Sequence, residues 1–271
     1  MRRAVAAFAL VLATGAPAFA TWSVIALDQK TGTMVIASAT CEPQRGFAAM
    51  HAKGLMDIQA IVVPGRAAAV AQGTFDSTRA TQQLIYTELG KGTDPGAIEF
   101  ILRQDPAIEV RQFGILDMEG RHTAFSAPGR PAAALHEQGQ VPGTDIWYSI
   151  QGDSMASEDV AHAAVQALAE YHAELADRVM GAMEAADARG GDRRCSCATE
   201  PAPKAACETR TAHVAYILRA EKNDSNKQSY NDGRYAMYLS VTDDDIAPTE
   251  NANPVKTLRL RYEVWKRARP D

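Results

Sequence analysis

The stretch TWSVIALDQKTGTMVIASA, residues 21–39, decides the fold of this chain. It contains two runs rich in β-branched residues, Thr21–Leu27 and Thr33–Ala39, joined by the five residues DQKTG. Such runs are typical of strands, and a short connection that begins with Asp and ends with Gly joins antiparallel strands. The sequence therefore predicts a β-hairpin over residues 21–39.

The residues before this hairpin have the three parts of a secretory signal peptide. Arg2 and Arg3 form a short positive region, residues 4–13 form an apolar run, and Ala18-Phe19-Ala20 has the small residues of a cleavage site. The run is too short to span a bilayer, and no later segment has about 20 consecutive apolar residues. We expect residues 1–20 to be removed, which leaves a periplasmic or secreted protein with Thr21 at its N-terminus and no membrane attachment.

The composition is that of an ordinary globular protein. Of 271 residues, 46% are hydrophobic and 23% are charged, with 28 basic and 33 acidic side chains. The net charge of −5 falls to −7 when Arg2 and Arg3 leave, so the composition gives no basic surface for nucleic acid. We expect residues 21–271 to form a single domain.

Runs of strands alternate with pairs of helices along the rest of the chain. This order predicts an α+β protein with stacked sheets and helices outside. Strands are predicted at residues 58–63, 67–71, 110–116, 121–126, 145–151, 213–220 and 234–241. Helices are predicted from Asp76 or Ser77 to Leu89 with Gly90 as the stop, from Thr93-Asp94-Pro95 onward, and over 157–188 with a break near 171–176 or at Gly181. Residues 256–265 are predicted to form a short terminal element.

Several short motifs, in collinear order, resemble a bacterial family called domain of unknown function 1028. The hairpin pattern T-x-S-V-I-A-x-D-x-x-T-G is the first of them. Ala69-Val70-Ala71-Gln72, Glu109-Val110-Arg111-Gln112, Ile150-Gln151-Gly152 and Gly190-Gly191-Asp192-Arg193-Arg194 follow. This family is placed in the N-terminal-nucleophile (Ntn) hydrolase superfamily, so the resemblance implies a four-layer αββα sandwich with two antiparallel sheets between helical layers.

The same resemblance implies a catalytic centre at the mature N-terminus. Thr21 would attack the carbonyl of a small-molecule or peptide-like amide, with its own α-amino group as the base. Backbone at Gln72 and Gly73 would stabilise the oxyanion. Asp192 and Arg193 would order the N-terminal amine or bind an acidic group of the substrate.

Two positions depart from the pattern of the family. Ser38 stands where proteasome-type members have an aspartate, so it is a candidate for substrate binding, and Asp153 replaces an asparagine near the oxyanion site. A charged carboxylate would oppose an oxyanion unless it were protonated. No lysine is in clear register with the catalytic lysine of those members, and Lys53 is the nearest. A non-catalytic periplasmic binding or structural protein on the same fold is therefore the alternative.

Gly152-Asp153-Ser154 also matches the nucleophile block of lipase-like esterases. Asp159 and His162 even form a D-x-x-H pair, but those enzymes bring this pair from near the C-terminus. An esterase built on Ser154 is a second alternative for the chemistry.

The four cysteines make an even count in a chain expected to be exported, which favours two disulfides. A Cys195–Cys197 bridge would close a very small, strained ring, which leaves two pairings. Of these we expect Cys41–Cys195 and Cys197–Cys207, with the second bridge pinning an insertion over residues 195–211. A zinc site on the C-x-C pair is the alternative.

The remaining candidate ligands show no metal-binding pattern. The six histidines lack H-E-x-x-H or similar spacing, and Asp243-Asp244-Asp245 lacks the spaced carboxylates and glycine of a calcium loop. We expect neither a metal nor a cofactor. The sequence does not name the substrate, and it leaves a homo-oligomer open.

Overall fold

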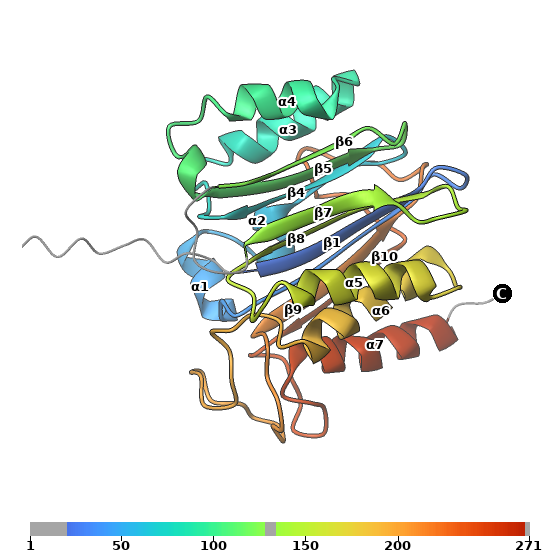
Figure 1. Cartoon of the computed structure of the whole chain (residues 1–271). Helices are drawn as coiled ribbons and strands as arrows, with labels where there is room; N and C mark the ends of the chain where they lie inside the picture. The colour runs from blue at the N-terminus through green and yellow to red at the C-terminus, as the bar shows by residue number, and fades with distance from the viewer. Residues whose placement is uncertain (1–20, 128–133, 269–271) are drawn as a thin grey trace, which may run out of the picture.

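The protein has four layers, which Figure 1 shows in a computed structural model that describes residues 21–127 and 134–268. Two antiparallel sheets lie face to face between two layers of helices. The α+β sandwich with the layer order αββα is thereby confirmed. The predicted signal peptide, residues 1–20, lies outside the described residues.

The larger sheet has the strand order β10-β9-β2-β1-β8-β7. Its strands are β1 (Thr21–Asp28), β2 (Thr33–Thr40), β7 (Leu135–Gln140), β8 (Ile146–Asp153), β9 (Val214–Ala220) and β10 (Met237–Thr242). The predicted hairpin is confirmed as β1 and β2, which pair from Thr21 opposite Thr40 to Asp28 opposite Thr33. Because β1 lies between β2 and β8, its first residue has a neighbouring strand on both sides.

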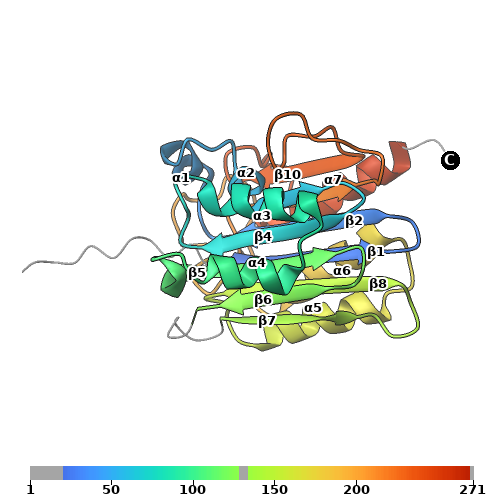
Figure 2. The same ribbon diagram turned by 90° about the horizontal axis from the view of Figure 1, so that it is seen from above.

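The smaller sheet has the strand order β3-β4-β5-β6. Its strands are β3 (Ala60–Val63), β4 (Ala67–Gly73), β5 (Arg111–Asp117) and β6 (His122–Ser126), and a short 3-10 helix, η1 (Ile108–Val110), precedes β5. Helices α3 (Ala80–Lys91) and α4 (Pro95–Leu102) cover its outer face (Figure 2). Ile85 and Ile98 of these helices pack with Phe113 and Ile115 of β5 in a buried cluster.

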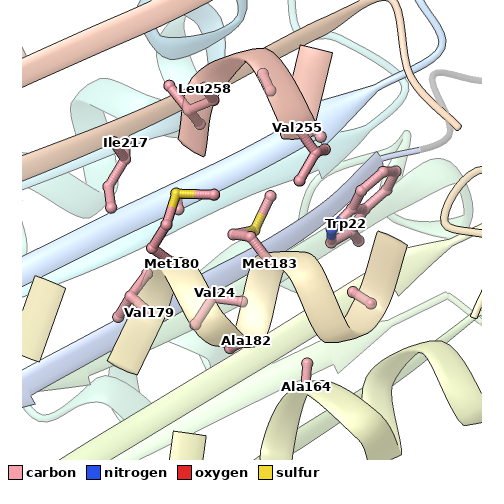
Figure 3. Packing of buried hydrophobic residues seen from close by; sticks show 14 of the residues in the cluster. Trp22, Val24, Ala164, Val179, Met180, Ala182, Met183, Ile217, Val255 and Leu258 are labelled. Atoms are coloured by element: carbon pink, nitrogen blue, oxygen red, sulfur yellow. The ribbon is translucent and has the colours of Figure 1, made fainter. Parts of the chain in front are cut away.

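Three helices cover the outer face of the larger sheet. They are α5 (Asp159–Glu170), α6 (Leu175–Ala188) and α7 (Pro254–Ala268). Figure 3 shows Trp22 and Val24 of β1 pointing toward Met183 of α6 and Val255 of α7. No helix in the described part of the chain is both long and apolar enough to cross a membrane.

The layer between the sheets changes character along β1. Ile25 and Leu27 lie in an apolar cluster with residues of β2, β4 and β9. Because strand side chains alternate between faces, Thr21 and Ser23 point into the same layer at the other end of the strand. The inter-sheet layer is therefore apolar at one end and polar at the end where β1 begins.

Besides the single-turn helix η1, three elements were not predicted from the sequence. Helices α1 (Gln44–Ala49) and α2 (Leu55–Gln59) have six and five residues, which is too short to show a helical period. Strand β7 reads LHEQGQ and lacks apolar alternation. It forms because its backbone pairs with β8, which is a tertiary effect.

Several predicted boundaries shift. Helix α3 begins at Ala80, after a turn in which Asp76 Oδ2 accepts a hydrogen bond from the Thr81 N–H at 2.9 Å. It ends at Lys91, because the left-handed residue that stops it is Gly92, with φ 83°, and not Gly90. The predicted start of α4 at Thr93-Asp94-Pro95 and the break between α5 and α6 near residues 171–176 are confirmed, and the Asp94 side chain caps α4 by accepting from the Gly96 N–H.

Candidate functional site

The polar end of the inter-sheet layer contains Thr21, and the register of the sheet fixes its neighbours. Thr21 pairs with Thr40 on β2 and with Asp153 on β8. Directly opposed residues of antiparallel strands point to the same face, with Cβ atoms about 5 Å apart. The Thr21 hydroxyl donates to Thr40 Oγ1 at 3.2 Å, and the three residues are at most 2% exposed. A hydroxyl, a second hydroxyl and a carboxylate thus lie in one row across three strands.

Gln72, at the end of β4, connects this row to the smaller sheet. Its side-chain Nε2 donates to the Thr21 carbonyl oxygen at 3.0 Å and to Gln112 Oε1 at 2.6 Å. Its Oε1 accepts from Ser23 Oγ and from Gln59 Nε2, each at 2.8 Å. Both amide hydrogens of Gln72 are therefore engaged, and this side chain holds the peptide of Thr21 in place.

The network continues through two more buried glutamines. Gln112 Nε2 donates to the Gly152 carbonyl at 2.9 Å, and Ser23 Oγ contacts Gln151 Oε1 at 3.0 Å. Gly114 of β5 makes room for this network, because a Cβ there would lie 1.9 Å from Gln151 Nε2. Buried amides need partners to offset their desolvation, so this set fixes the spacing of the two sheets around Thr21.

A pocket opens beside Thr21. The space between the lining atoms is about 310 Å³, part of it open to solvent. Its lining residues are Thr21, Thr40, Glu42, Phe47, Leu55, Ile58, Gln59, Ala71, Gln72, Gly73 and Phe75. Gly73 lines it at the end of β4 with φ 89°, a conformation that favours glycine. The structure thus brings Thr21, Gln72 and Gly73 together at one cavity, with Asp153 beside them in the sheet.

Glu42 is the ionisable side chain among the residues that line the pocket. Burial raises the pKa of this carboxyl above its usual value, while Arg194 and Arg45 act in the opposite direction. The protonated form is therefore favoured more than in water.

Asp192, Arg193 and Ser38, like Asp153, are predicted site residues that are not among the residues that line the pocket. Asp192 is 1% exposed and accepts from the Cys41 N–H at 3.0 Å and from Arg194 Nη2 at 2.8 Å. Arg193 is exposed, and its N–H donates to the Ser154 carbonyl at 3.3 Å. Ser38 donates to the Trp22 carbonyl at 2.7 Å and is fully buried. In this structure Asp192 and Ser38 make contacts that stabilise the fold.

Gly191 shows why the G-G-D segment contains glycine. Its φ is 47°, and a Cβ there would lie 2.6 Å from the ring of Trp22. The segment therefore packs closely against Trp22, the residue that follows Thr21 along β1. This contact stabilises the start of β1 from the side that the helices cover.

Ser154 and His162 do not come together as an esterase pair. The Ser154 hydroxyl donates to Asp153 Oδ1 at 3.2 Å, whereas His162 Nε2 lies 2.9 Å from Glu137 Oε1. Lys53 is exposed and lines a different cavity with Asp57. Because Ser154, His162 and Lys53 make these other contacts, the candidate site is the polar end of the inter-sheet layer.

Both expected disulfides, Cys41–Cys195 and Cys197–Cys207, are confirmed. Candidate ligand atoms of Cys41, Cys195 and His213 lie within 4.8 Å of one another. The two sulfurs are bonded to each other, so they are not available as the thiolates that zinc requires. The ring of His213 is instead paired with Asp243 and Arg210 through Nδ1.

Sequence reasoning missed four residues that shape the site: Thr40, Glu42, Gln59 and Gln112. Gln59 and Gln112 had a detectable signal, because a glutamine on the inward face at the end of an apolar run is unusual. Thr40 and Glu42 had none. They reach the site only through the pairing of β1 with β2 and the turn that follows β2.

Two comparisons with known proteins gave a match. A family model described as "Family of unknown function (DUF1028)" matches residues 21–200. The crystal structure of protein SPO2555 from Silicibacter pomeroyi, described by the same family model, is similar with a TM-score of 0.65 and 18% identity, over 93% of this chain and 88% of that one. That likeness shows the fold. No curated protein sequence gives a significant match.

Proposed function

We propose that this chain, which belongs to the DUF1028 family of unknown function, is an exported Ntn-type amidohydrolase whose mature N-terminus is Thr21. One observation carries the proposal. The first residue of a central strand presents a hydroxyl to a pocket, in a row with Thr40 and Asp153. The row lies where cleavage after Ala20 would create a free α-amino group.

The proposed reaction begins with attack of Thr21 Oγ1 on the amide carbonyl carbon. The hydroxyl proton moves to the α-amino group, whose reference pKa of about 7.7–8.0 leaves a useful fraction as free base near neutral pH. Collapse of the tetrahedral intermediate breaks the C–N bond, and the α-ammonium returns the proton to the leaving amine. Water then hydrolyses the acyl ester on Thr21 and releases a carboxylic acid.

The surrounding residues are proposed to divide the remaining work. Backbone at Gln72 and Gly73 holds the oxyanion, while the Gln72 side chain positions Thr21 through its carbonyl. Asp153 is fully buried opposite Thr21, and its carboxylate suits a cation better than an oxyanion. We therefore propose that the Asp153 carboxylate stabilises the α-ammonium group that forms during attack.

Export is part of the same proposal, because the chemistry requires removal of residues 1–20. Two disulfides are compatible with a periplasmic or secreted location, since such bridges persist in oxidising compartments. N-terminal sequencing and intact mass of the exported protein test this step. A start other than Thr21, or a blocked Thr21 in an active protein, would rule the mechanism out.

The second candidate function is a non-catalytic binding or structural protein on the same fold. Two observations favour this second function. The Thr21 hydroxyl donates a hydrogen bond to Thr40, whereas a resting nucleophile usually faces its base, and Thr21 is only 2% exposed. A β-lactone that acylates N-terminal threonine separates the two functions. The proposed enzyme is labelled stoichiometrically on Thr21, whereas the binding protein is not labelled.

Thr33 offers a matched control for this experiment. It is a buried threonine, 5% exposed, at the opposite end of the same hairpin. Thr33→Ala should keep full labelling and Thr21→Ala should lose it. Equal labelling of both variants would show that the probe reacts elsewhere and would contradict the proposal.

A further inference from the structure

We infer that the pocket beside Thr21 selects amides whose acyl group is apolar and carries no carboxylate, a statement that rests on the proposed function. The acyl carbon must reach Thr21 Oγ1, so the group attached to it occupies the space that opens from this atom. The chemistry of that space then decides which acids the enzyme releases.

The walls of the pocket are mostly hydrocarbon. Phe47 of α1 is fully buried, and Leu55 and Ile58 of α2 are 4% and 6% exposed. Phe75 closes another side, where the guanidinium of Arg79 lies 4.7 Å from its ring centroid. All four aromatic or aliphatic side chains belong to the apolar inter-sheet cluster or pack against it. The pocket is therefore a gap in the core that reaches Thr21.

The charge of the lining points the same way. Glu42 is the one residue with an ionisable side chain among those that line the pocket, and none of the lining residues is an arginine or a lysine. An acyl chain that ended in a carboxylate would meet Glu42, while the arginines that act on Glu42, Arg45 and Arg194, do not line the pocket. A second cavity of about 490 Å³ shows the contrast, because it is lined by Arg66, Arg121, Asp117 and Glu119.

The enclosed part of the pocket is small, with room for about one water molecule, and the rest of the space of about 310 Å³ is open to solvent. An acyl chain attached to Thr21 Oγ1 therefore lies along the apolar wall and extends toward solvent. Each added methylene that leaves water against this wall should strengthen the reaction about fourfold until the wall is covered.

A set of β-lactone probes tests the inference on the full mature protein. The probes share the reactive ring and differ in the side chain: methyl, butyl, hexyl, benzyl, or a butyl chain ending in a carboxylate. We expect the rate of Thr21 acylation to rise about fourfold per methylene from methyl to butyl. We expect the carboxylate probe to react at least about tenfold more slowly than butyl.

Two variants and one control assign these effects to the pocket. Phe75→Ala removes a partly exposed wall and should flatten the dependence on chain length. Glu42→Gln should raise the rate of the carboxylate probe relative to the rate of the butyl probe, because the carboxylate of the wall is lost. Phe100→Ala changes a phenylalanine of α4 that is 70% exposed and outside the pocket, and it should match the wild type.

The outcomes separate the two levels of the proposal. Labelling of Thr21 at rates that ignore chain length and charge would overturn the acyl-group inference and leave the amidohydrolase intact. No labelling by any probe, in a protein that starts at a free Thr21, would overturn both. A third outcome would place the selection outside this pocket. In it, the acylation rate of Phe75→Ala still depends on chain length, and Glu42→Gln reacts with the carboxylate probe at the wild-type rate.

Discussion

The two ends of the inter-sheet layer are built from the same strands and differ in every property that matters for function. At one end, Ile25, Leu27 and Ile36 are fully buried against apolar residues of the other sheet. At the other end, Thr21 and Gln72 belong to a buried set of hydroxyls and amides. The change occurs within a few residues along β1.

This difference separates stability from chemistry. Burial of the apolar end removes hydrocarbon from water and stabilises the sandwich. The polar end gains little net free energy, because each hydrogen bond replaces one that water would make. Its amides are partnered and immobile, which suits a site that must hold a hydroxyl beside a pocket.

The largest effect should come from Thr21→Ala in the mature protein. We expect the rate of probe acylation and of amide turnover to fall at least about 10³-fold, because the nucleophile is lost. The free energy of unfolding should change by about 1 kcal/mol or less, since one hydrogen bond to Thr40 is removed. Retained turnover with a normally folded variant would contradict the role of Thr21.

The bridge next to the polar end should matter more for stability than the bridge in the insertion. Cys41–Cys195 joins residues 154 apart and Cys197–Cys207 joins residues 10 apart. A chain-entropy model gives about 5 and about 3 kcal/mol for loops of these lengths. Urea unfolding of the two double Cys→Ser variants measures the difference, and an equal loss would show that loop length does not decide it.

Ile36→Ala tests the apolar end. Ile36 is fully buried, so we expect the free energy of unfolding to fall by about 3 kcal/mol, within the usual range of about 2–5 kcal/mol for such a truncation. The folded fraction should still acylate at the wild-type rate, because the change lies away from the pocket lining. A large loss of rate in the folded protein would mean that the two ends are coupled.

Gln72→Ala should affect both stability and chemistry. It removes partners from Ser23, Gln59 and Gln112, so we expect a loss of about 2 kcal/mol and slower acylation of Thr21. Gln138→Ala is the matched control, since Gln138 bonds to Thr123 and Ser149 and does not line the pocket. If both variants slow acylation equally, the effect is not specific to Gln72.

The smallest effect is expected from Asp76→Ala, in the turn that links the polar end to α3. Burial alone would raise the pKa of Asp76, but hydrogen bonds from Thr78 and Thr81 lower it from 3.8 to about 2. The ionised form is thus favoured by folding, so its contribution is fully present above about pH 4 and disappears as the pH falls through about 2. We expect a loss of about 1 kcal/mol at pH 6. The urea unfolding curves of the wild type and of Asp76→Ala should differ at pH 6 and coincide at pH 2. A difference in the free energy of unfolding that is the same at both pH values would exclude the carboxylate as its cause.

The sequence predicted the strands and long helices because their patterns are local. The hairpin, the start of α4 at Pro95 and the break between α5 and α6 all follow from residues near one another. Strand β7 and the short helices α1 and α2 were missed, because they form only against neighbouring elements. Of the site residues, Gln72 and Gly73 were predicted with Thr21, whereas Thr40 and Glu42 were not.

Sequence alone determined the alternation that puts Thr21 and Ser23 on the face of Ile25 and Leu27, since the period of a strand is two residues. It also determined that Thr21 begins the first strand. Only the tertiary structure decided which side chains meet there. Gln72 and Gln112 come from the other sheet, and the apolar wall comes from helices too short to detect. Contacts between residues so far apart in the chain depend on how the two sheets stack, which no local pattern encodes.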